Sequence, residues 1–487
     1  MRTRIPCALF ALIITVCLCD CAVPIAPGYR IINESRDIQF MASTPPALKI
    51  QSAYTLVNSG TAQLTFLDVT LPSISTFGLT DLHAELDGLH TECQDLPAEL
   101  RFDSPNAMRI VFGSHWKQGA KHDLAIQYSF RSPSELGSQI TLNATDFHIG
   151  SRGGFAQLQP PKHLLAPYPK RPNQMYYTVR VPADFRVLAR GTPAGRKQEG
   201  AEIAYRYRLL STDLAPFVVA GRYAQSAPLG DSGPVFWTLQ PVSVPADVAK
   251  EIYDAWETLE KDYGPLDKNI RAPHIVETSH LPPDVAGEEG PAAAAFPGGA
   301  LVDAGDVAQS GGSAAFVDAV SHALAHNWFG DEMYAVPNAT LGIGEGLPEY
   351  ATIVIDGARG GQSARSERIA DYLEEFDVAL KEGTEQTLAV SRLTDPQPER
   401  RIALAKAPLF FAALEDECGS TAMQAALEQV VTLMRGQEVG YAAIRAALEE
   451  TSGKNLAPVF RLWLNEKGIP DDFRARYATK GAAPNHR

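Results

Sequence analysis

The chain contains 487 residues, of which 45% are hydrophobic and 21% are charged. At roughly 100–200 residues per domain, this length predicts two or three packed domains. The 38 glycines and 35 prolines fall well short of the roughly 25–30% at which an aperiodic chain becomes low complexity, which excludes collagen-like and globally disordered classes. The net charge of -14 supplies no basic surface for nucleic acid, so we expect no nucleic-acid partner.

Residues 1–22 are predicted to be a secretory signal peptide and not part of the fold. Arg2 and Arg4 precede an apolar run at residues 5–19, which is short for a membrane-spanning helix but matches the hydrophobic region of a signal. We therefore expect an exported protein that is periplasmic, extracellular or lipid-anchored at the cell surface. Membrane attachment would occur only through a lipid anchor, although the residues before Cys21 fit a lipoprotein signal poorly.

Residues 38–235 are predicted to form a β-rich N-terminal domain. Short alternating or β-branched runs end at turn residues there, a spacing that is typical of antiparallel sheets. The clearest runs are residues 54–57, 64–67, 176–181 and 217–220.

In residues 236–475 the spacing of apolar residues changes to the period of a helix. Residues 476–487 are predicted to be a tail. Apolar side chains recur at helical spacing along Ala246–Tyr263, including Ile252 and Trp256. A short strand is predicted at residues 275–276, and later helices at residues 364–382, 406–417, 422–434 and 456–466. The fold class is therefore α+β, with a β-rich part followed by a mostly helical part.

The residues that carry chemistry concentrate in one later segment. Ser313 can cap a helix that ends at Gly330, and on it His322 and His326 lie four residues apart, so both imidazoles project from one face. Glu345 follows where a second helix is predicted to begin. Two imidazoles and one carboxylate leave a tetrahedral zinc ion one open position, as in catalytic sites. We expect these three side chains to bind one Zn²⁺ ion.

These motifs resemble those of the gluzincin zinc aminopeptidases, the family typified by membrane alanyl aminopeptidase. The family signature is H-E-L-A-H-Q-W-F-G, followed after a spacer by the Glu of W-L-N-E-G-F-A. This chain has H-A-L-A-H-N-W-F-G from His322 onward and I-G-E-G-L around Glu345. Residues 212–221 and 452–470 look like the ends of the family's two domains. The resemblance implies a saddle-like antiparallel β domain, a thermolysin-like zinc-metallopeptidase domain and a peptide cleft between them.

Three positions depart from the family pattern. The family's general base, the Glu after the first histidine, aligns with Ala323, and its oxyanion-binding Tyr aligns with Leu404. The Glu that holds the substrate's amino terminus aligns with Ala295, or with Glu289 in an alternative register, and Phe296 and Gly298 of the same segment are expected substrate contacts. A general base typically contributes about 10²–10⁴ in rate and an oxyanion donor about 10²–10³, so efficient peptide cleavage is not expected. An engineered substitution would account for Ala323 alone.

Two functional classes remain open at this point. The first is a zinc-binding, exported protein of this family whose peptidase activity is lost or strongly attenuated, and which binds peptides or a protein partner in its cleft. The second is an active zinc-dependent hydrolase of peptides, amides or esters that uses a different general base, with Glu289 as the candidate. A plainer interpretation is that zinc only holds two helices together.

Side chains near the metal ligands have simpler interpretations. Asp318 lies one turn before His322 and either orients its ring or is an acid near a helix N-terminus. Glu349, four residues after Glu345, either contacts a metal ligand or faces solvent, and we expect it to face solvent. Trp328 and Phe329 are expected to pack in the core behind the metal-binding helix.

Overall fold

The computed structural model describes residues 28–60, 63–72, 79–96, 107–131, 140–150, 154–159, 172, 174–210, 216–226, 233–266, 272–279, 281, 293–309, 313–392 and 395–477. The predicted signal peptide and most of the predicted tail lie outside these residues. Within the described ranges, no helix is both long enough and apolar enough to cross a membrane.

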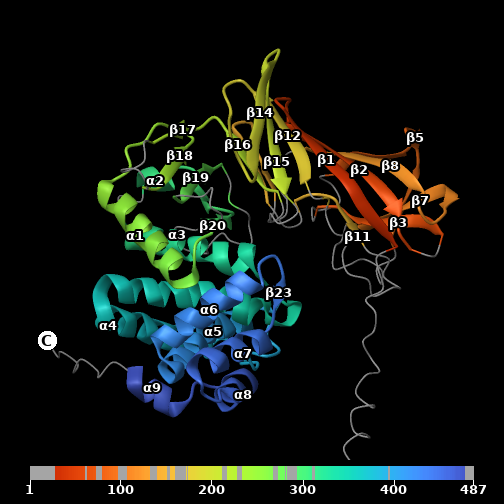
Figure 1. The fold of residues 1–487 in the computed structure, drawn as a ribbon. Coiled ribbons are helices and arrows are strands. Elements are labelled where there is room, and N and C mark those ends of the chain that lie inside the picture. Colours follow the sequence, from red (N-terminus) through yellow and green to blue (C-terminus); the bar gives the residue numbers. More distant parts are fainter. Residues whose placement is uncertain are drawn as a thin grey trace, which may run out of the picture.

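A large sheet dominates the N-terminal part of the chain (Figure 1). Its eight strands lie in the order β14-β15-β12-β1-β2-β8-β4-β5, and only β1 and β12 pair in parallel. The strands are β1 (Tyr29–Met41), β2 (Ala47–Asn58), β4 (Leu79–Leu86), β5 (Leu89–His90), β8 (Lys121–Arg131), β12 (Gln174–Pro182), β14 (Thr192–Glu199) and β15 (Glu202–Leu210). Along β2, Leu48, Ile50 and Leu56 are buried and alternate with outward residues, because one face of the sheet covers a core.

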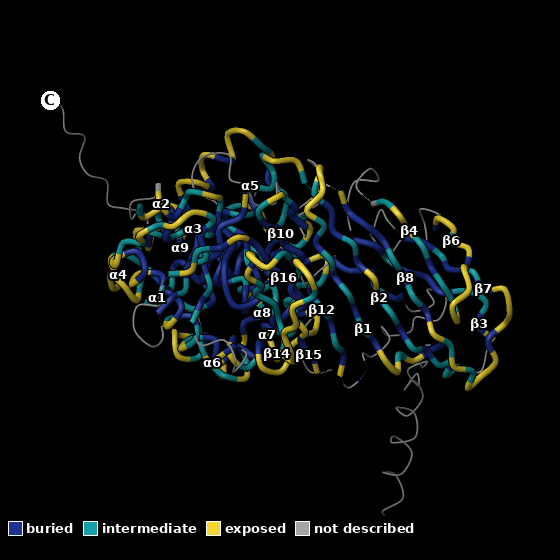
Figure 2. The backbone as a smooth tube through the Cα atoms, turned by 90° about the horizontal axis from the view of Figure 1, so that it is seen from above, coloured by how far each residue is buried: buried dark blue, intermediate teal, exposed yellow. Residues whose placement is uncertain are grey.

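Two four-stranded sheets contribute to the same core. Their strand orders are β11-β3-β7-β6 and β13-β16-β10-β9. The strands are β3 (Leu64–Thr70), β6 (Glu92–Asp95), β7 (Ala107–Trp116), β9 (Ile140–Leu142), β10 (Asp146–Ile149), β11 (Gln157–Gln159), β13 (Arg186–Ala189) and β16 (Val218–Gly221). Phe40 of β1 stacks on Phe147 of β10 with ring centroids 5.6 Å apart, within one hydrophobic cluster that joins all three sheets. Figure 2 shows the alternation of buried and less buried residues along β1, β2 and β8.

A five-stranded sheet begins the second part of the molecule, in the order β17-β18-β19-β21-β20. The strands β18, β19 and β21 are parallel, and both edge strands are antiparallel to their neighbours. The strands are β17 (Ala224–Gln225), β18 (Val235–Thr238), β19 (His274–Thr278), β20 (Ala293–Phe296) and β21 (Gly299–Asp303). Helix α1 (Ala246–Tyr263) connects β18 to β19 and has the bounds that its periodicity predicts, with Ile252 and Trp256 fully buried.

The rest of the described chain is mostly helical. The helices are α2 (Asp306–Gln309), α3 (Ala314–His326), α4 (Gly346–Ala379), α5 (Gln397–Cys418), α6 (Ser420–Leu433), α7 (Tyr441–Ser452), α8 (Ala457–Asn465) and α9 (Asp471–Tyr477). Shorter elements are a 3₁₀ turn η4 (Pro337–Ala339), two π-helical turns, η3 (Asn327–Glu332) and η5 (Thr340–Glu345), and the paired strands β22 (Tyr334–Ala335) and β23 (Glu438–Val439). Helix α4 is interrupted at Gly361, whose φ of 71° is favourable for glycine.

The predicted α+β class is confirmed, with a β-rich part followed by a mostly helical part (Figure 1). The two parts are linked through Asp146 of β10, whose carboxylate accepts hydrogen bonds from the Thr278 hydroxyl at 2.9 Å and the Ser279 amide at 3.0 Å. The domain limits at residues 38–235 and 236–475 stay predictions.

Candidate metal centre

Helix α3 carries both histidines and begins where the sequence predicts. The Ser313 hydroxyl caps it by accepting a hydrogen bond from the Phe316 amide at 3.3 Å. One turn separates His322 from His326, and their Nε2 atoms lie 3.0 Å apart. Both side chains remain partly accessible, at 23% and 20% exposure, so a ligand can reach them from solvent.

The structure interrupts the helix close to the predicted stop at Gly330. Helix α3 ends at His326, and the π-helical turn η3 that follows is kinked at Phe329, whose φ of -104° and ψ of 28° are not helical. A Cβ atom built at Gly330 would lie 3.3 Å from Nδ1 of His326, which is tighter than usual. The absence of a side chain at Gly330 therefore eases the close approach of the backbone to the imidazole.

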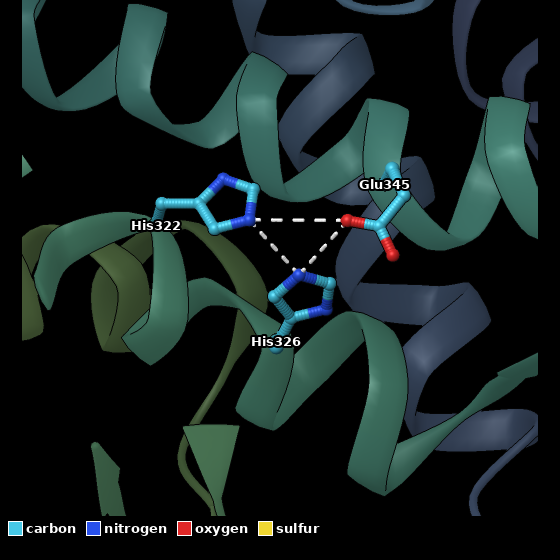
Figure 3. Close-up of side chains that lie close together, drawn as sticks. All are labelled: His322, His326 and Glu345. Carbon is cyan, nitrogen blue, oxygen red and sulfur yellow. Dashed lines mark hydrogen bonds and ion pairs between the residues drawn. The ribbon is translucent and has the colours of Figure 1, made fainter. Parts of the chain in front are cut away.

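Glu345 approaches the two histidines from the last residue of η5, immediately before α4. Its Oε2 lies 3.3 Å from Nε2 of His326 and 3.9 Å from Nε2 of His322 (Figure 3). The next residue, Gly346, lies so close to α5 that a Cβ atom there would be only 2.7 Å from the Ala407 Cβ. Glycine at this position therefore permits the tight packing that holds the start of α4, and with it Glu345, beside α3.

The three ligand atoms fit a zinc ion. Zinc binds imidazole nitrogen and carboxylate oxygen at about 2.0–2.2 Å, so neighbouring ligand atoms in a tetrahedral site lie about 3.3 Å apart. One ligand atom from each of His322, His326 and Glu345 lies within 4.8 Å of the others. Among the described residues, these three form the cluster of His, Cys, Asp or Glu side chains that could hold a metal ion. Three protein ligands leave a coordination position free for water or a ligand.

Glu349 is placed beside the metal centre and not in solvent, contrary to the sequence prediction. Its Oε1 lies 3.4 Å from Nδ1 of His322, and its Oε2 accepts a hydrogen bond from the Tyr372 hydroxyl. That hydroxyl lies 3.2 Å from Oγ1 of Thr352 on the same helix as Glu349. A carboxylate behind the ring fixes the orientation of a metal-ligating histidine and raises its basicity.

The electrostatic field at His322 is negative. Burial alone would lower the pKa of His322, but Glu349 and Glu345 outweigh burial and raise this pKa to about 9. Burial alone would raise the pKa of Glu349, but His322 and the Tyr372 hydrogen bond lower it to about 2. Since an imidazole binds a metal only in its neutral form, zinc would take the place of the proton that these carboxylates stabilise.

Asp318 does not orient the His322 ring. Its Oδ2 accepts a hydrogen bond of 2.5 Å from Nη2 of Arg368, whose Nε donates to Asp356 at 2.6 Å. Asp318 therefore links α3 to α4, and of its two interpretations the metal-positioning one is wrong. The sequence could not indicate this, because Arg368 lies far along the chain from Asp318.

Asn327, which the sequence analysis did not single out, links the metal-binding helix to the neighbouring sheet. Its Oδ1 accepts a hydrogen bond of 2.5 Å from the Gly298 amide, and its Nδ2 donates to the Gly299 carbonyl at 3.2 Å. These bonds hold the turn between β20 and β21 against the end of α3. The position directly after the second histidine of the motif was the signal that could have indicated Asn327.

The remaining predicted site residues lie on different elements. Ala323 is on α3 and fully buried, and Leu404 is on α5, partly buried against the helical core. Ala295 and Phe296 lie on β20, and Gly298 lies in the turn that follows it. Their roles toward a substrate stay predictions, and Glu289 falls outside the described residues.

The aromatic pair after the second histidine packs in the core, as predicted. Trp328 and Phe329 are both buried, and the Trp328 indole donates a hydrogen bond to the Gly264 carbonyl at 2.8 Å. Trp328 also contacts Trp256 of α1, with ring centroids 5.3 Å apart. This packing anchors the end of α3 to α1.

Comparison with known proteins places this geometry in a recognised fold. No protein-family model matches the chain, and no curated protein matches it significantly. Among solved structures, a glutamate-to-alanine mutant of the M1 zinc metallopeptidase from Deinococcus radiodurans is similar, with a TM-score of 0.60 and 17% identity over 91% of this chain and 96% of that chain. The mutant bound to a Tyr-Ser-Ala substrate gives a TM-score of 0.61 and 16% identity over 91% of this chain and 95% of that one.

Yeast LTA4 hydrolase in complex with bestatin is also similar, with a TM-score of 0.60 and 14% identity over 91% of this chain and 68% of that chain. At these identities the likeness concerns the fold. The chain therefore has the fold of the M1 zinc metallopeptidases, and within it a His-His-Glu ligand set of the kind that binds zinc.

Proposed function

We propose that the protein is a divergent, exported relative of the gluzincin zinc aminopeptidases that binds one zinc ion and holds a peptide, or an extended segment of a partner protein, beside it. Its peptidase activity is lost or strongly attenuated. The observation that carries this proposal is the convergence of His322, His326 and Glu345 around one point next to a buried alanine, Ala323, at the position that the resemblance assigns to the general base.

The described residues around the histidines offer no obvious replacement for that base. Glu345 and Glu349 are the described carboxylates in ion-pair contact with the two imidazoles. Glu345 faces the Nε2 atoms as a metal ligand, while Glu349 is engaged with Nδ1 of His322 and with Tyr372. Each carboxylate therefore already has a role that conflicts with shuttling a proton between water and a leaving amine.

Zinc supplies part of the chemistry even without a base, because it polarises a carbonyl and lowers the pKa of bound water. The missing base costs typically about 10²–10⁴ in rate, and Leu404 at the expected oxyanion position offers no hydrogen bond. From a median turnover near 10 per second, the remaining rate would be on the order of 10⁻¹ per second or lower.

A peptide is the ligand that the neighbouring sheet favours. Strand β20 is the edge strand of the five-stranded sheet as described, and it packs beside α3. An extended peptide can add to such an edge through main-chain hydrogen bonds. Asn327 fixes the turn after β20 against the metal-binding helix, so a peptide on this edge would lie near the zinc. The Deinococcus mutant, which also has alanine in place of a glutamate, is bound to a tripeptide substrate.

Export rests on the sequence of residues 1–22, where Arg2 and Arg4 precede an apolar run. Fractionation of cells that express the full chain tests this proposal. We expect mature protein outside the cytoplasm with a new N-terminus, and unprocessed protein in the cytoplasm would contradict export.

The function itself is tested by measuring metal content, peptide binding and turnover on the same preparation of the full chain. We expect one equivalent of zinc, binding of tripeptide amides, and turnover at least about 100-fold below an ordinary enzyme. His326→Gln should lose both zinc and peptide, whereas His115→Gln, at an exposed imidazole on β7, should keep both.

Three results would contradict the proposal. Rapid, chelator-sensitive turnover by the wild type would identify a working zinc hydrolase with another base, and its loss in Glu289→Gln would locate that base. Peptide binding that survives the loss of zinc would show that the ion only holds helices together. Absence of zinc from carefully prepared protein would remove the metal centre itself.

A further inference from the structure

A second pair of histidines lies on the β4–β5 hairpin, at the opposite end of the molecule from α3 (Figure 1). His83 is on β4 and His90 is on β5, and their Nδ1 atoms lie only 3.1 Å apart. The two rings are nearly parallel, with centroids 4.8 Å apart and an interplanar angle of 16°. Two ring nitrogens at this distance share either one proton or one metal ion.

A carboxylate fixes one ring of this pair. Oε1 of Glu85 lies 2.9 Å from Nε2 of His83, on the same outward face of β4. When Nε2 carries the proton and donates it to Glu85, Nδ1 of His83 has its lone pair free and directed toward His90. This carboxylate–histidine arrangement is the one that orients metal-ligating imidazoles and increases their basicity.

The backbone of the hairpin is firmly held. Asp87 and Gly88 have φ angles of 51° and 77°, as a tight two-residue hairpin turn requires, and they place His90 directly opposite Glu85. Oδ1 of Asp87 accepts a hydrogen bond from the Asp123 amide at 2.9 Å, and its Oδ2 lies 2.7 Å from Nδ1 of His122. The fold itself therefore holds the Nδ1 atoms of His83 and His90 together, which would reduce the entropic cost of binding a ligand there.

The surroundings are accessible and acidic. The side chains of His83 and Glu85 are 40% and 45% exposed. A surface hollow of about 310 Å³ adjoins the hairpin and is lined in part by Glu85, Gly88 and Asp123. Negative side chains in a surface hollow attract cations and raise their local concentration.

We propose that His83 and His90 form a binding site for a divalent transition-metal ion, through their Nδ1 atoms, with Glu85 as the residue that positions His83. Imidazole suits Cu²⁺, Zn²⁺ and Ni²⁺, and the general order of affinities places Cu²⁺ first among these ions. When both Nδ1 atoms bind the ion, each neutral imidazole carries its proton on Nε2, and water or a further side chain completes the coordination. This site is independent of the α3 centre, so its presence or absence leaves the proposed function unaffected.

The test uses the full chain with zinc already bound at the α3 centre, and titrates it with Cu²⁺ at pH 7.5 under calorimetry and electron paramagnetic resonance. The wild type should bind copper with a spectrum that shows coupling to two imidazole nitrogens. His90→Gln and His83→Gln should each weaken this binding at least tenfold and remove the two-nitrogen pattern. Glu85→Gln should weaken it about 10- to 100-fold while the two-nitrogen pattern remains, as expected of a positioning residue.

The matched control is His115→Gln, because His115 is an exposed histidine on strand β7 of a different sheet. It should leave the copper stoichiometry and spectrum unchanged. The far-UV circular dichroism spectrum reports that each variant is folded, and His90 is exposed, so its replacement should be tolerated. If His90→Gln binds copper with the wild-type affinity and spectrum, or if the wild type binds no copper beyond the α3 centre, the proposal is overturned. A change of thermal stability without a change in copper binding would identify the pair as a structural hydrogen bond and would also overturn it.

Discussion

Histidines in two regions of the molecule have pKa values that are shifted in opposite directions. At the interface between the β-rich part and the five-stranded sheet, burial lowers the pKa of His148 to about 4, and it lowers the pKa of His274 to about 4 as well. At the α3 centre, burial acts in the same direction on His322, but Glu349 and Glu345 raise its pKa to about 9. The difference comes from the carboxylates, because burial is common to both regions.

This comparison shows what the α3 region is built to hold. A buried imidazole without an acidic neighbour stays neutral, as His148 does with neither ring nitrogen bonded. Two imidazoles facing two carboxylates instead form a negative site that favours a cation, and the three converging ligand atoms suit a zinc ion. The surroundings of the interface histidines suit a packing role, and the surroundings of the α3 histidines suit metal binding.

Adding a further acid to the α3 region should have the largest effect. Ala323→Glu places a carboxylate at the position that the resemblance assigns to the general base, and we expect it to raise slow peptide hydrolysis by about 10²–10⁴-fold. Because Ala323 is fully buried, the variant should also lose about 1–3 kcal/mol of stability through overpacking. Ala323→Gln matches the size without accepting a proton. Turnover assays should separate the two variants, and equal rates would refute this account of Ala323.

Removing an acid that contacts both imidazoles should have the next largest effect. Glu345→Gln replaces a direct ligand, and we expect zinc affinity to fall by more than the roughly 10- to 100-fold that loss of an outer partner costs. Metal analysis after dialysis measures this loss, and thermal unfolding should show a matching decrease in stability. Glu257→Gln, on the exposed face of α1, is the control and should retain zinc. Full zinc occupancy in Glu345→Gln would be incompatible with the proposed ligand set.

A smaller effect is expected for the acid behind the ring. Glu349→Gln keeps the hydrogen-bonding shape but removes the charge that faces His322, and we expect zinc affinity to fall about 10- to 100-fold. Asp318→Asn, on α3 itself, should leave zinc affinity unchanged, because Asp318 bonds Arg368 and not a ligand ring. Competition with a chromophoric chelator gives both affinities. Equal affinities for the two variants would mean that Glu349 has no positioning role.

The interface histidines should produce the smallest effect, and it depends on pH. His148 has a pKa of about 4 in the folded protein, against about 6.5 when unfolded. The neutral His148 imidazole therefore contributes fully to the free energy of unfolding above about pH 6.5. This contribution is lost as the pH falls toward 4, because the unfolded state takes up the proton first. Between pH 7.5 and pH 5 this amounts to about 2 kcal/mol.

Urea unfolding at the two pH values measures this loss. His148→Leu should lose about 2 kcal/mol less than the wild type on acidification, and His115→Gln should behave as the wild type does. His274, with a pKa lowered in the same direction, maintains part of the pH dependence in both variants. An unchanged pH dependence in His148→Leu would show that this imidazole is not buried in its neutral form.

The sequence was sufficient to predict helices and clusters of side chains that depend on local spacing along the chain. Helix α1 has its predicted bounds, and the i, i+4 histidines with Glu345 at the start of the next helix are brought together as expected. What the sequence did not reveal depends on packing between elements. The residues around Glu349 in the sequence are compatible with a side chain that faces solvent and with one that contacts the His322 ring. Only the placement of α4 beside α3 brings Glu349 to His322.

Other outcomes depend on partners far along the chain. Asp318 shares a helix face with His322, but Arg368 of α4 bonds it, and no local pattern indicates that partner. The roles of Ala295 and Leu404 stay predictions, since they depend on a bound substrate.

The most direct test of the central claim is the turnover of the zinc-loaded wild type on tripeptide amides, measured with and without a chelator alongside calorimetric binding of the same peptides. The account predicts zinc-dependent binding with turnover on the order of 10⁻¹ per second or lower. Chelator-sensitive turnover near 10 per second would contradict it, because a site with Ala323 at the position proposed for the base would then be carrying out ordinary peptidase catalysis.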